Sequence, residues 1–200
     1  MYMSKGTETR DRILASALRV ASVEGLEGIT IGRLADAVGL SKSGLFAHFK
    51  SKEELQLAVL NAATEAFGEV VFTPALAAPR GEPRVRAFFE HWLEWESHVS
   101  VPGGCIFMHL SVELDDQEGP ARDALVMAQR WWLDQLARAT RLAVSAGDFR
   151  PDVDAELFAF QMHGILSAYY HAKRLLRDPN AGERARKAFD ALVVSVSAPR

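Results

Sequence analysis

The sequence predicts an all-α protein in which a three-helix helix-turn-helix unit comes first and a helical bundle follows. Apolar residues recur every three or four positions through most of the chain, as Ile13, Ala17 and Ala21 do near its start. Residues that commonly cap helices precede several of these segments, and clusters of proline and glycine separate them. Apolar residues make up 48% of the 200 residues and charged residues 24%, which is the composition of an ordinary soluble globular protein.

Four helices are expected in the N-terminal third of the chain, over residues 9–23, 31–37 and 42–48 and from Lys52 onward. The helix that begins at Lys52 keeps its apolar spacing to Val70, so we expect no linker after the helix-turn-helix. A continuous helix of this kind would carry a change in the C-terminal part of the chain to the N-terminal part.

Short polar residues and a glycine mark the ends of these helices. Thr30 and Ser41 are expected to cap the second and third helices through their hydroxyl groups. Gly39 is expected to end the second helix in the left-handed conformation. Ser51 and Glu54 match the S-x-x-E pattern of a capping box at the start of the fourth. So many caps in a short segment favour a helix-turn-helix over a helical hairpin that serves only to pack.

The outward side chains of this unit indicate DNA binding. The second helix of a helix-turn-helix can enter the major groove, where short polar side chains approach the base edges closely. Lysines beside a helix N-terminus suit phosphate groups, which set the register on the duplex. The expected DNA-binding residues are Thr30, Arg33, Ser41, Lys42, Ser43, Gly44, Phe46, His48, Lys50 and Lys52.

The net charge of −3 is unevenly distributed along the chain. Up to Lys52 there are eight lysines and arginines against five acidic residues, a local excess of three positive charges, and the remainder carries −6. A locally basic N-terminal part would direct DNA to one end of the molecule. Because the excess is small, binding should depend on geometry more than on bulk charge.

The segment GLEGITI followed by LADAVGLSKSGLFAHFKSKEEL closely resembles the DNA-binding domain of the TetR family of bacterial transcriptional regulators, over about residues 9–60. The shared features occur in order: the Gly25 to Thr30 lead-in, the Leu-Ala pair at Leu34, the Gly-Leu-Ser-Lys turn, two aromatic residues, and the Lys-Ser-Lys-Glu-Glu start of the next helix. Gly32 stands where the family usually has alanine, and Phe46 where it more often has a tyrosine whose hydroxyl reaches a phosphate. The resemblance implies dimerisation through the last two helices and an effector bound among the central ones.

The C-terminal part is expected to be helical throughout, after a loop over residues 73–83. Further helices are predicted over residues 84–98, 105–114, 120–146, 153–177 and 181–196. Asp152 is placed as the cap of the helix over 153–177. We therefore divide the chain into a DNA-binding domain, residues 1–55, and a C-terminal domain for ligand binding and dimerisation, residues 56–200.

The last two predicted helices, 153–177 and 181–196, each carry two apolar lines. Phe160, Gly164 and Ala168 lie on one line of the first of them. A helix that is apolar on two sides must be covered on both, and a homodimer through these two helices would supply the second cover. Two-fold symmetry would also match the two half-sites of a palindromic operator. The alternative left open is that both lines form the internal core of a monomer.

Aromatic and polar residues gather in the middle of the chain, where a small-molecule effector is expected. Ligand sites are typically apolar cavities with few polar groups. The candidate ligand-binding residues are Trp92, Trp95, Met108, His109, Trp131, Gln135, Met162 and Tyr169. An aromatic residue of this kind is more often part of the core than a ligand contact. The prediction of a ligand site therefore depends on all of these residues occurring together.

Other functions have weak support in the sequence. No serine–histidine–acid arrangement and no glycine-rich phosphate loop is present, so we expect no enzyme and no cofactor. No apolar run is long enough to cross a bilayer and no secretion signal is evident, so we expect a cytoplasmic protein without a membrane partner. His91, Glu94 and His98 share a helix face, which is more typical of a solvated surface than of a metal site.

The sequence therefore predicts a one-component transcriptional regulator. It would act as a repressor that binds a palindromic operator as a homodimer and is released by a small molecule. Cys105, the one cysteine in the sequence, leaves a second hypothesis open. In this alternative the chain is a helical small-molecule-binding or redox-sensing protein whose DNA reading is weak or lost, although a lone cysteine among apolar residues is more often buried.

Overall fold

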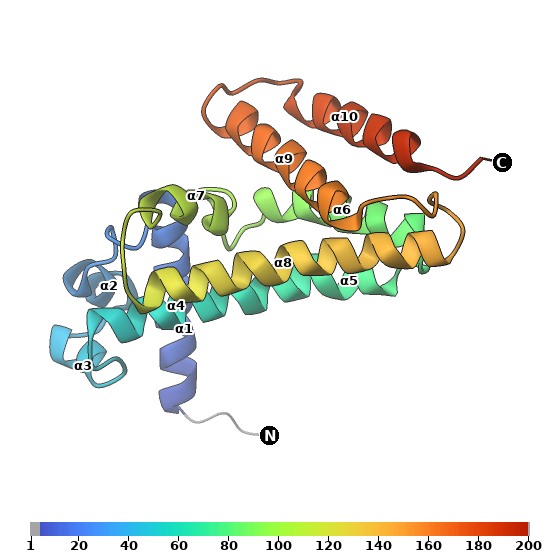
Figure 1. The fold of residues 1–200 in the computed structure, drawn as a ribbon. Coiled ribbons are helices and arrows are strands. Elements are labelled where there is room, and N and C mark those ends of the chain that lie inside the picture. The colour runs from blue at the N-terminus through green and yellow to red at the C-terminus, as the bar shows by residue number, and fades with distance from the viewer. Residues whose placement is uncertain (1–4, 200) are drawn as a thin grey trace. The chain divides into compact units, whose positions relative to one another are not determined.

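A computed structural model describes residues 5–199 (Figure 1). Within these residues the backbone forms α-helices and one π-helical segment, and the one β contact is an isolated bridge between Phe149 and Ser197. The all-α prediction is confirmed. The chain forms two compact units, which we call unit 1 and unit 2.

Unit 1 comprises the chain up to Ala66 together with Ser97–Met127. It contains α1 (Lys5–Glu24), α2 (Ile31–Val38), α3 (Lys42–Phe46), most of α4 (Lys52–Phe67), α7 (Ile106–Glu113) and the first turns of α8 (Pro120–Ser145). Unit 2 comprises Phe67–Glu96 and the chain from Ala128 onward. It contains η1, the π-helical segment (Gly68–Phe72), α5 (Thr73–Ala77), α6 (Glu82–Glu96), the rest of α8, α9 (Ala155–Arg174) and α10 (Ala181–Val196).

The expected caps of the helix-turn-helix are present. The Thr30 hydroxyl accepts a hydrogen bond from the Arg33 N–H, and the Ser41 hydroxyl accepts one of 3.0 Å from the Gly44 N–H. Gly39 has a φ of 70°, the left-handed conformation that ends α2. α3 stops at Phe46 and is therefore shorter than the predicted 42–48.

The capping box at the start of α4 forms in a shifted version. The Ser51 hydroxyl accepts a hydrogen bond of 3.0 Å from the Glu54 N–H, as predicted. The Glu54 carboxylate, however, accepts from the N–H of Lys50, one residue earlier than a capping box requires. Both backbone donors are still satisfied, so α4 begins where the sequence places it.

Unit 1 also holds the segment around α7 against the end of α1. The Gly103 N–H donates to the Ser22 hydroxyl at 3.1 Å, in a buried position. The Glu113 carboxylate accepts the backbone N–H groups of Leu26 and Glu27 at 3.0 and 2.8 Å. Glu113 therefore fixes the turn between α1 and α2.

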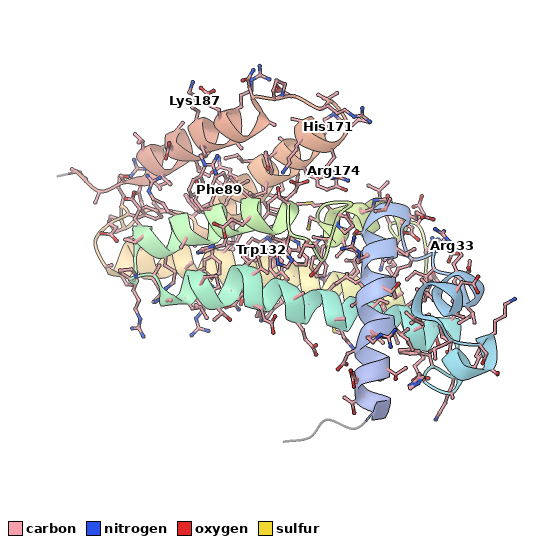
Figure 2. The ribbon with its side chains drawn as sticks, turned by 180° about the vertical axis from the view of Figure 1, so that it is seen from behind. Arg33, Phe89, Trp132, His171, Arg174 and Lys187 are labelled. Atoms are coloured by element: carbon pink, nitrogen blue, oxygen red, sulfur yellow. The ribbon has the colours of Figure 1, made fainter. Side chains whose placement is uncertain are left out.

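In unit 2, α9 and α10 form a helical hairpin (Figure 1) and α10 also meets α6. Phe89 of α6, which is labelled in Figure 2, stacks on Phe189 of α10. Their ring centroids are 4.0 Å apart and their planes 6° apart. Arg86 pairs with Asp190 beside these rings, at 2.6 Å. Aromatic stacking and ion pairing together hold α10 in place.

A second aromatic cluster fills the middle of unit 2. Phe67, Phe72 and Trp132 lie with their ring centroids 5.2 to 6.2 Å apart, mostly edge to face. Trp95 meets Phe67 at 5.5 Å in the same T-shaped arrangement. These rings join η1, α6 and α8 into one core.

Two local predictions in the C-terminal part are wrong. Residues 73–77 are helical, whereas the sequence suggested a loop over 73–83. Pro74 lies just after η1, so its missing N–H falls where the hydrogen-bond pattern changes from π to α. The cap of α9 is Asp154, whose carboxylate accepts from the Leu157 N–H at 2.9 Å. Asp152 instead pairs with the Arg150 side chain at 3.1 Å.

The helical stretch Lys52–Ala77 is long and apolar enough to meet the simple criteria for a membrane span, with a mean hydropathy of 1.2. This differs from the expectation that no apolar run reaches that length. Val59, Ala63, Phe67 and Val71 along it are buried, at the four-residue spacing of a core helix. One such helix is weak evidence for a membrane segment.

The close approach at Gly103 yields a prediction about stability. A Cβ at this position would lie 1.7 Å from the Ser22 carbonyl oxygen, so Gly103→Ala must displace backbone and should cost about 1–3 kcal/mol of unfolding free energy. Gly68→Ala is the matched control, since a Cβ there meets nothing within 4 Å. Urea unfolding followed by circular dichroism measures both. A Gly103→Ala variant as stable as the control would contradict the close packing of this segment on α1.

Candidate functional site

The residues expected to bind DNA all lie in unit 1, on α2, α3, the start of α4 and the turns between them. Most of these side chains are exposed, and Gly44 and His48 are half-buried. Leu45 and Phe49, on the inner side of this unit, are fully buried. Phe46, by contrast, is 49% exposed, so α3 presents an aromatic ring to solvent beside its polar residues.

Some of the residues expected to contact DNA also stabilise the helices that carry them. The hydroxyl groups of Thr30 and Ser41 accept the capping hydrogen bonds of α2 and α3. The hydroxyl of Ser43 lies 3.0 Å from that of Ser41 and shares a hydrogen bond with it. The cap therefore holds Ser43 at the exposed start of α3.

Two of the cations are paired with carboxylates within unit 1. Arg33, at the surface of α2 (Figure 2), donates through both Nη atoms to Glu24, with the longer contact at 2.7 Å. Lys52 Nζ lies 2.8 Å from the Glu27 carboxylate. The hydrogen bond from Arg33 lowers the pKa of Glu24, and the hydrogen bond from Lys52 lowers the pKa of Glu27. All four side chains are substantially exposed, so these pairs add little stability.

The other two cations are unpaired in the part of the chain that the structure describes. No carboxylate there forms an ion pair with the ammonium groups of Lys42 or Lys50, and both side chains are exposed. Gly32 lies beside Lys42, and a Cβ added to it would come to 3.4 Å from Lys42 Cε, so the alanine common in the resembled family would also fit. These lysines are therefore the cations most available to a polyanion.

The arginines of α1 are used for packing. The Arg10 guanidinium lies 4.6 Å from the centre of the Phe49 ring. Arg12 donates to the Val38 carbonyl oxygen at 3.2 Å and so reaches the C-terminal end of α2. Both contacts tie α1 to the helix-turn-helix.

Of the residues proposed for ligand binding, four belong to the core of unit 2. Trp92, Trp95, Met162 and Tyr169 are at most 7% exposed, and the rings of Trp92 and Tyr169 meet edge to face at 6.3 Å. Trp131 is 46% exposed and stacks on an aromatic ring of η1. The structure thus gives these large side chains packing partners.

The remaining three candidates are separated. Met108 and His109 are half-buried residues of α7, in unit 1, whereas the other six candidates belong to unit 2. Gln135 of α8 lines a cavity of about 350 Å³ in unit 2. Arg80, Arg84 and Arg138, which were not singled out in the sequence, line the same cavity.

The redox hypothesis depends on Cys105, and the metal hypothesis on His91, Glu94 and His98. Cys105 is 1% exposed, and it occupies the N-cap position of α7. His91 Nδ1 lies 2.8 Å from the Glu94 carboxylate, which accounts for that pair as a hydrogen bond on the surface of α6. Within the described residues, no group of three or more His, Cys, Asp or Glu side chains is arranged to hold a metal ion.

Comparisons with known proteins agree with this architecture. Residues 13–59 match the family model described as bacterial regulatory proteins of the tetR family, and residues 81–189, more than half of the chain, match the tetracyclin repressor-like C-terminal domain. The HTH-type transcriptional regulator SrpR of Pseudomonas putida is 24% identical over 180 residues, which cover 89% of this chain and 81% of that protein.

Solved structures show the same fold over nearly the whole chain. A TetR transcriptional regulator from Chloroflexus aurantiacus J-10-FL superimposes with a TM-score of 0.87 at 25% identity, covering 98% of this chain and 100% of that one. AibR, whose crystal structure contains isovaleryl coenzyme A and operator DNA, has a TM-score of 0.72 at 24% identity, covering 96% and 100%. With a capped helix-turn-helix matched by one family model and the following helices by another, the chain belongs to the TetR family of bacterial transcriptional regulators.

Proposed function

We propose that this regulator is a homodimeric repressor that binds a palindromic operator through α3 and is released by a small-molecule effector. The observation that carries the proposal is the exposed start of α3. There the Ser41 cap and the burial of Leu45 present Lys42, Ser43 and Gly44 together at the surface. Short polar groups at the first turn of a helix suit base edges in the major groove.

The flanking lysines suit the phosphates on either side. Lys50 and Lys52 are exposed around the start of α4, and Lys42 is exposed at the start of α3. Phosphate contacts would fix the register and supply most of the salt dependence. Lys52 and Arg33 would have to exchange or share their carboxylate partners, Glu27 and Glu24, when DNA binds.

The proposed dimer rests on the outer faces of α9 and α10. Leu157, Phe160 and Leu175 of the 153–177 segment are 52 to 70% exposed, and Gly164 and Ala168 between them are exposed as well. The opposite face of α9 carries Phe158, Met162 and Leu166, which are buried. A continuous exposed apolar line on a helix favours a partner, and the small residues at its centre permit close helix packing.

The 181–196 segment continues the same surface. Ala188, Ala191 and Val194 are exposed on α10, while Ala185 and Phe189 are buried on its other side. A second copy of the chain offers the same two helices, so a two-fold axis would cover all four exposed lines at once. That symmetry would match a palindromic operator with half-sites about 34 Å apart.

In the proposed domain organisation, residues 1–55 bind DNA, and residues 56–200 form a C-terminal domain that dimerises and binds the effector. A relative in fold, AibR, binds both an acyl coenzyme A and operator DNA. In the present chain α4 begins in unit 1 and its last residue, Phe67, belongs to unit 2. A conformational change around Phe67 would therefore be transmitted along α4 to its start, beside Lys50 and Lys52.

The first experiment is selection of bound DNA from randomised duplexes by the purified full chain in the absence of added ligand. We expect enrichment of an inverted repeat, because a symmetric dimer reads the same half-site twice. Enrichment of a single half-site would contradict the dimeric mode. No enrichment by a folded protein would favour the alternative that the helix-turn-helix no longer reads DNA.

The unpaired Lys42 and the paired Lys52 predict opposite effects of two substitutions on operator affinity. Lys42→Ala should weaken binding and reduce the slope of log affinity against log salt by about one, because one phosphate contact is lost. Glu27→Gln should strengthen binding at low salt, because it frees Lys52 and removes a negative charge. Fluorescence anisotropy at several salt concentrations measures both.

The control for Glu27→Gln is Glu65→Gln, which removes an exposed acidic group of α4 outside the helix-turn-helix. At about 0.1 M salt it should leave the affinity within about twofold of the wild-type value, since the helix rise places Glu65 about 20 Å along α4 from Lys52, beyond the Debye length of about 10 Å. If Glu27→Gln and Glu65→Gln have equal effects, the Lys52–Glu27 pair does not restrain DNA binding.

Phe160→Glu should convert the dimer to a monomer on sedimentation, because the symmetry places the new carboxylates of both copies in one apolar interface. Val112→Glu is the matched control: Val112 is 74% exposed, against 70% for Phe160, and lies on α7. Gly164→Leu should weaken the dimer too, by preventing close approach of the helices. A dimeric Phe160→Glu variant would remove this face of α9 from the interface.

A further inference from the structure

The cavity in unit 2 has an unusual lining for a helical core. It is bounded by Leu76 of α5, by Arg80 in the turn that follows, by α6 and by α8, and it has a volume of about 350 Å³. On α8 the lining residues Gln135, Arg138 and Leu142 recur at intervals of three and four. One face of α8 is thus directed to the cavity.

Three arginines, Arg80, Arg84 and Arg138, are among the residues that line this cavity. In the part of the chain that the structure describes, no carboxylate forms an ion pair with any of them. Two other arginines of the same unit do have acidic partners: Arg86 pairs with two acids and Arg186 with one. The cavity therefore concentrates positive charge that no neighbouring side chain neutralises.

One of the three arginines is held in a fixed orientation. Arg84 donates from Nε and Nη2 to the Ala78 carbonyl oxygen, at 3.2 and 2.8 Å, and from Nη2 to the Leu76 carbonyl oxygen at 3.0 Å. These bonds fix the end of α5, and Nη1 takes no part in them. Arg80 and Arg138 are exposed, so their side chains can adjust to a bound group.

The rest of the lining is apolar. Phe88, Ala139 and Leu142 contribute hydrocarbon surface, and the Phe88 side chain is 2% exposed. Its ring lies 5.1 Å from that of Phe72 and 5.9 Å from that of Trp132, so the aromatic core of unit 2 supports this wall. The cavity thus offers cationic donors together with a firm apolar surface.

We propose that this cavity binds a small organic anion, with a carboxylate or phosphate head held by the three arginines and a short apolar part against Phe88 and Leu142. Arginine recognises both kinds of head through paired N–H donors. A cationic ligand would be repelled, and a neutral apolar one would desolvate the guanidinium groups without compensation. The anion is also the effector; that second step rests on the proposed function above.

The binding test uses isothermal titration calorimetry on the full chain at low ionic strength, with octanoate as the probe and octan-1-ol as its neutral counterpart. Octanoate should bind at least about tenfold more tightly than octan-1-ol, because charge-assisted hydrogen bonds form only with the carboxylate. Inorganic phosphate, which lacks the apolar part, should bind more weakly than octanoate. Equal affinity for octanoate and octan-1-ol would overturn the anion site.

The variant for this test is Arg138→Gln, since Arg138 is exposed on a long helix and its replacement should not disturb folding. Arg130→Gln is the matched control: Arg130 is also exposed on α8 but does not line the cavity. We expect Arg138→Gln to weaken octanoate binding by about tenfold or more and Arg130→Gln to leave it unchanged. Equal losses in the two variants would indicate nonspecific attraction by charge and would contradict the site.

Release from DNA is measured separately, by anisotropy with the selected operator. Octanoate should dissociate the wild type and Arg130→Gln but not Arg138→Gln. Binding of octanoate that requires Arg138 but leaves the operator complex intact would keep the anion site and refute its role as the effector site. If the chain selects no operator, the calorimetry still decides the anion site by itself.

Discussion

The burial of Leu45 and Phe49 is the constraint on which the recognition surface of this protein depends. A helix as short as α3, Lys42–Phe46, has no stability of its own in water. It forms because Ser41 caps its first turn, Gly39 lets the chain reverse, and both apolar side chains are fully buried in unit 1. The same burial fixes which side of α3 remains exposed. The geometry of the proposed DNA contact is therefore a consequence of core packing.

Charge plays a smaller part than the number of lysines and arginines suggests. Of the cations near the helix-turn-helix, Arg33 and Lys52 are paired with Glu24 and Glu27, while Lys42 remains available. An acid beside each paired cation limits nonspecific attraction to polyanions and leaves shape and hydrogen bonding to decide where the protein binds. This agrees with the small positive excess of the N-terminal part and gives it a structural reason.

The helices that form the internal core of unit 2 also form the proposed dimer interface and the walls of the cavity. α9 buries Met162 and Tyr169 on one side and exposes Phe160 on the other, so its apolar surface is divided between an internal core and a proposed interface. The large aromatic residues that the sequence suggested for an effector are mostly core. The cavity that remains is lined by arginines, which sequence reasoning passed over because Arg80, Arg84 and Arg138 look like ordinary surface residues there. Their shared position depends on how α5, α6 and α8 pack.

The sequence by itself determined most of the helices, the caps of the helix-turn-helix and the two apolar faces of α9 and α10, because these depend on residues within a turn or two of one another. Thr30, Gly39 and Ser41 could be assigned for that reason. The Asp152 cap was wrong because Asp154, two residues on, has the same capping carboxylate and takes that position. Tertiary structure decided which partners distant residues meet. The Lys52–Glu27 pair spans 25 positions and the Gly103–Ser22 bond 81, and no local pattern encodes such contacts, since they arise only when separate helices pack together.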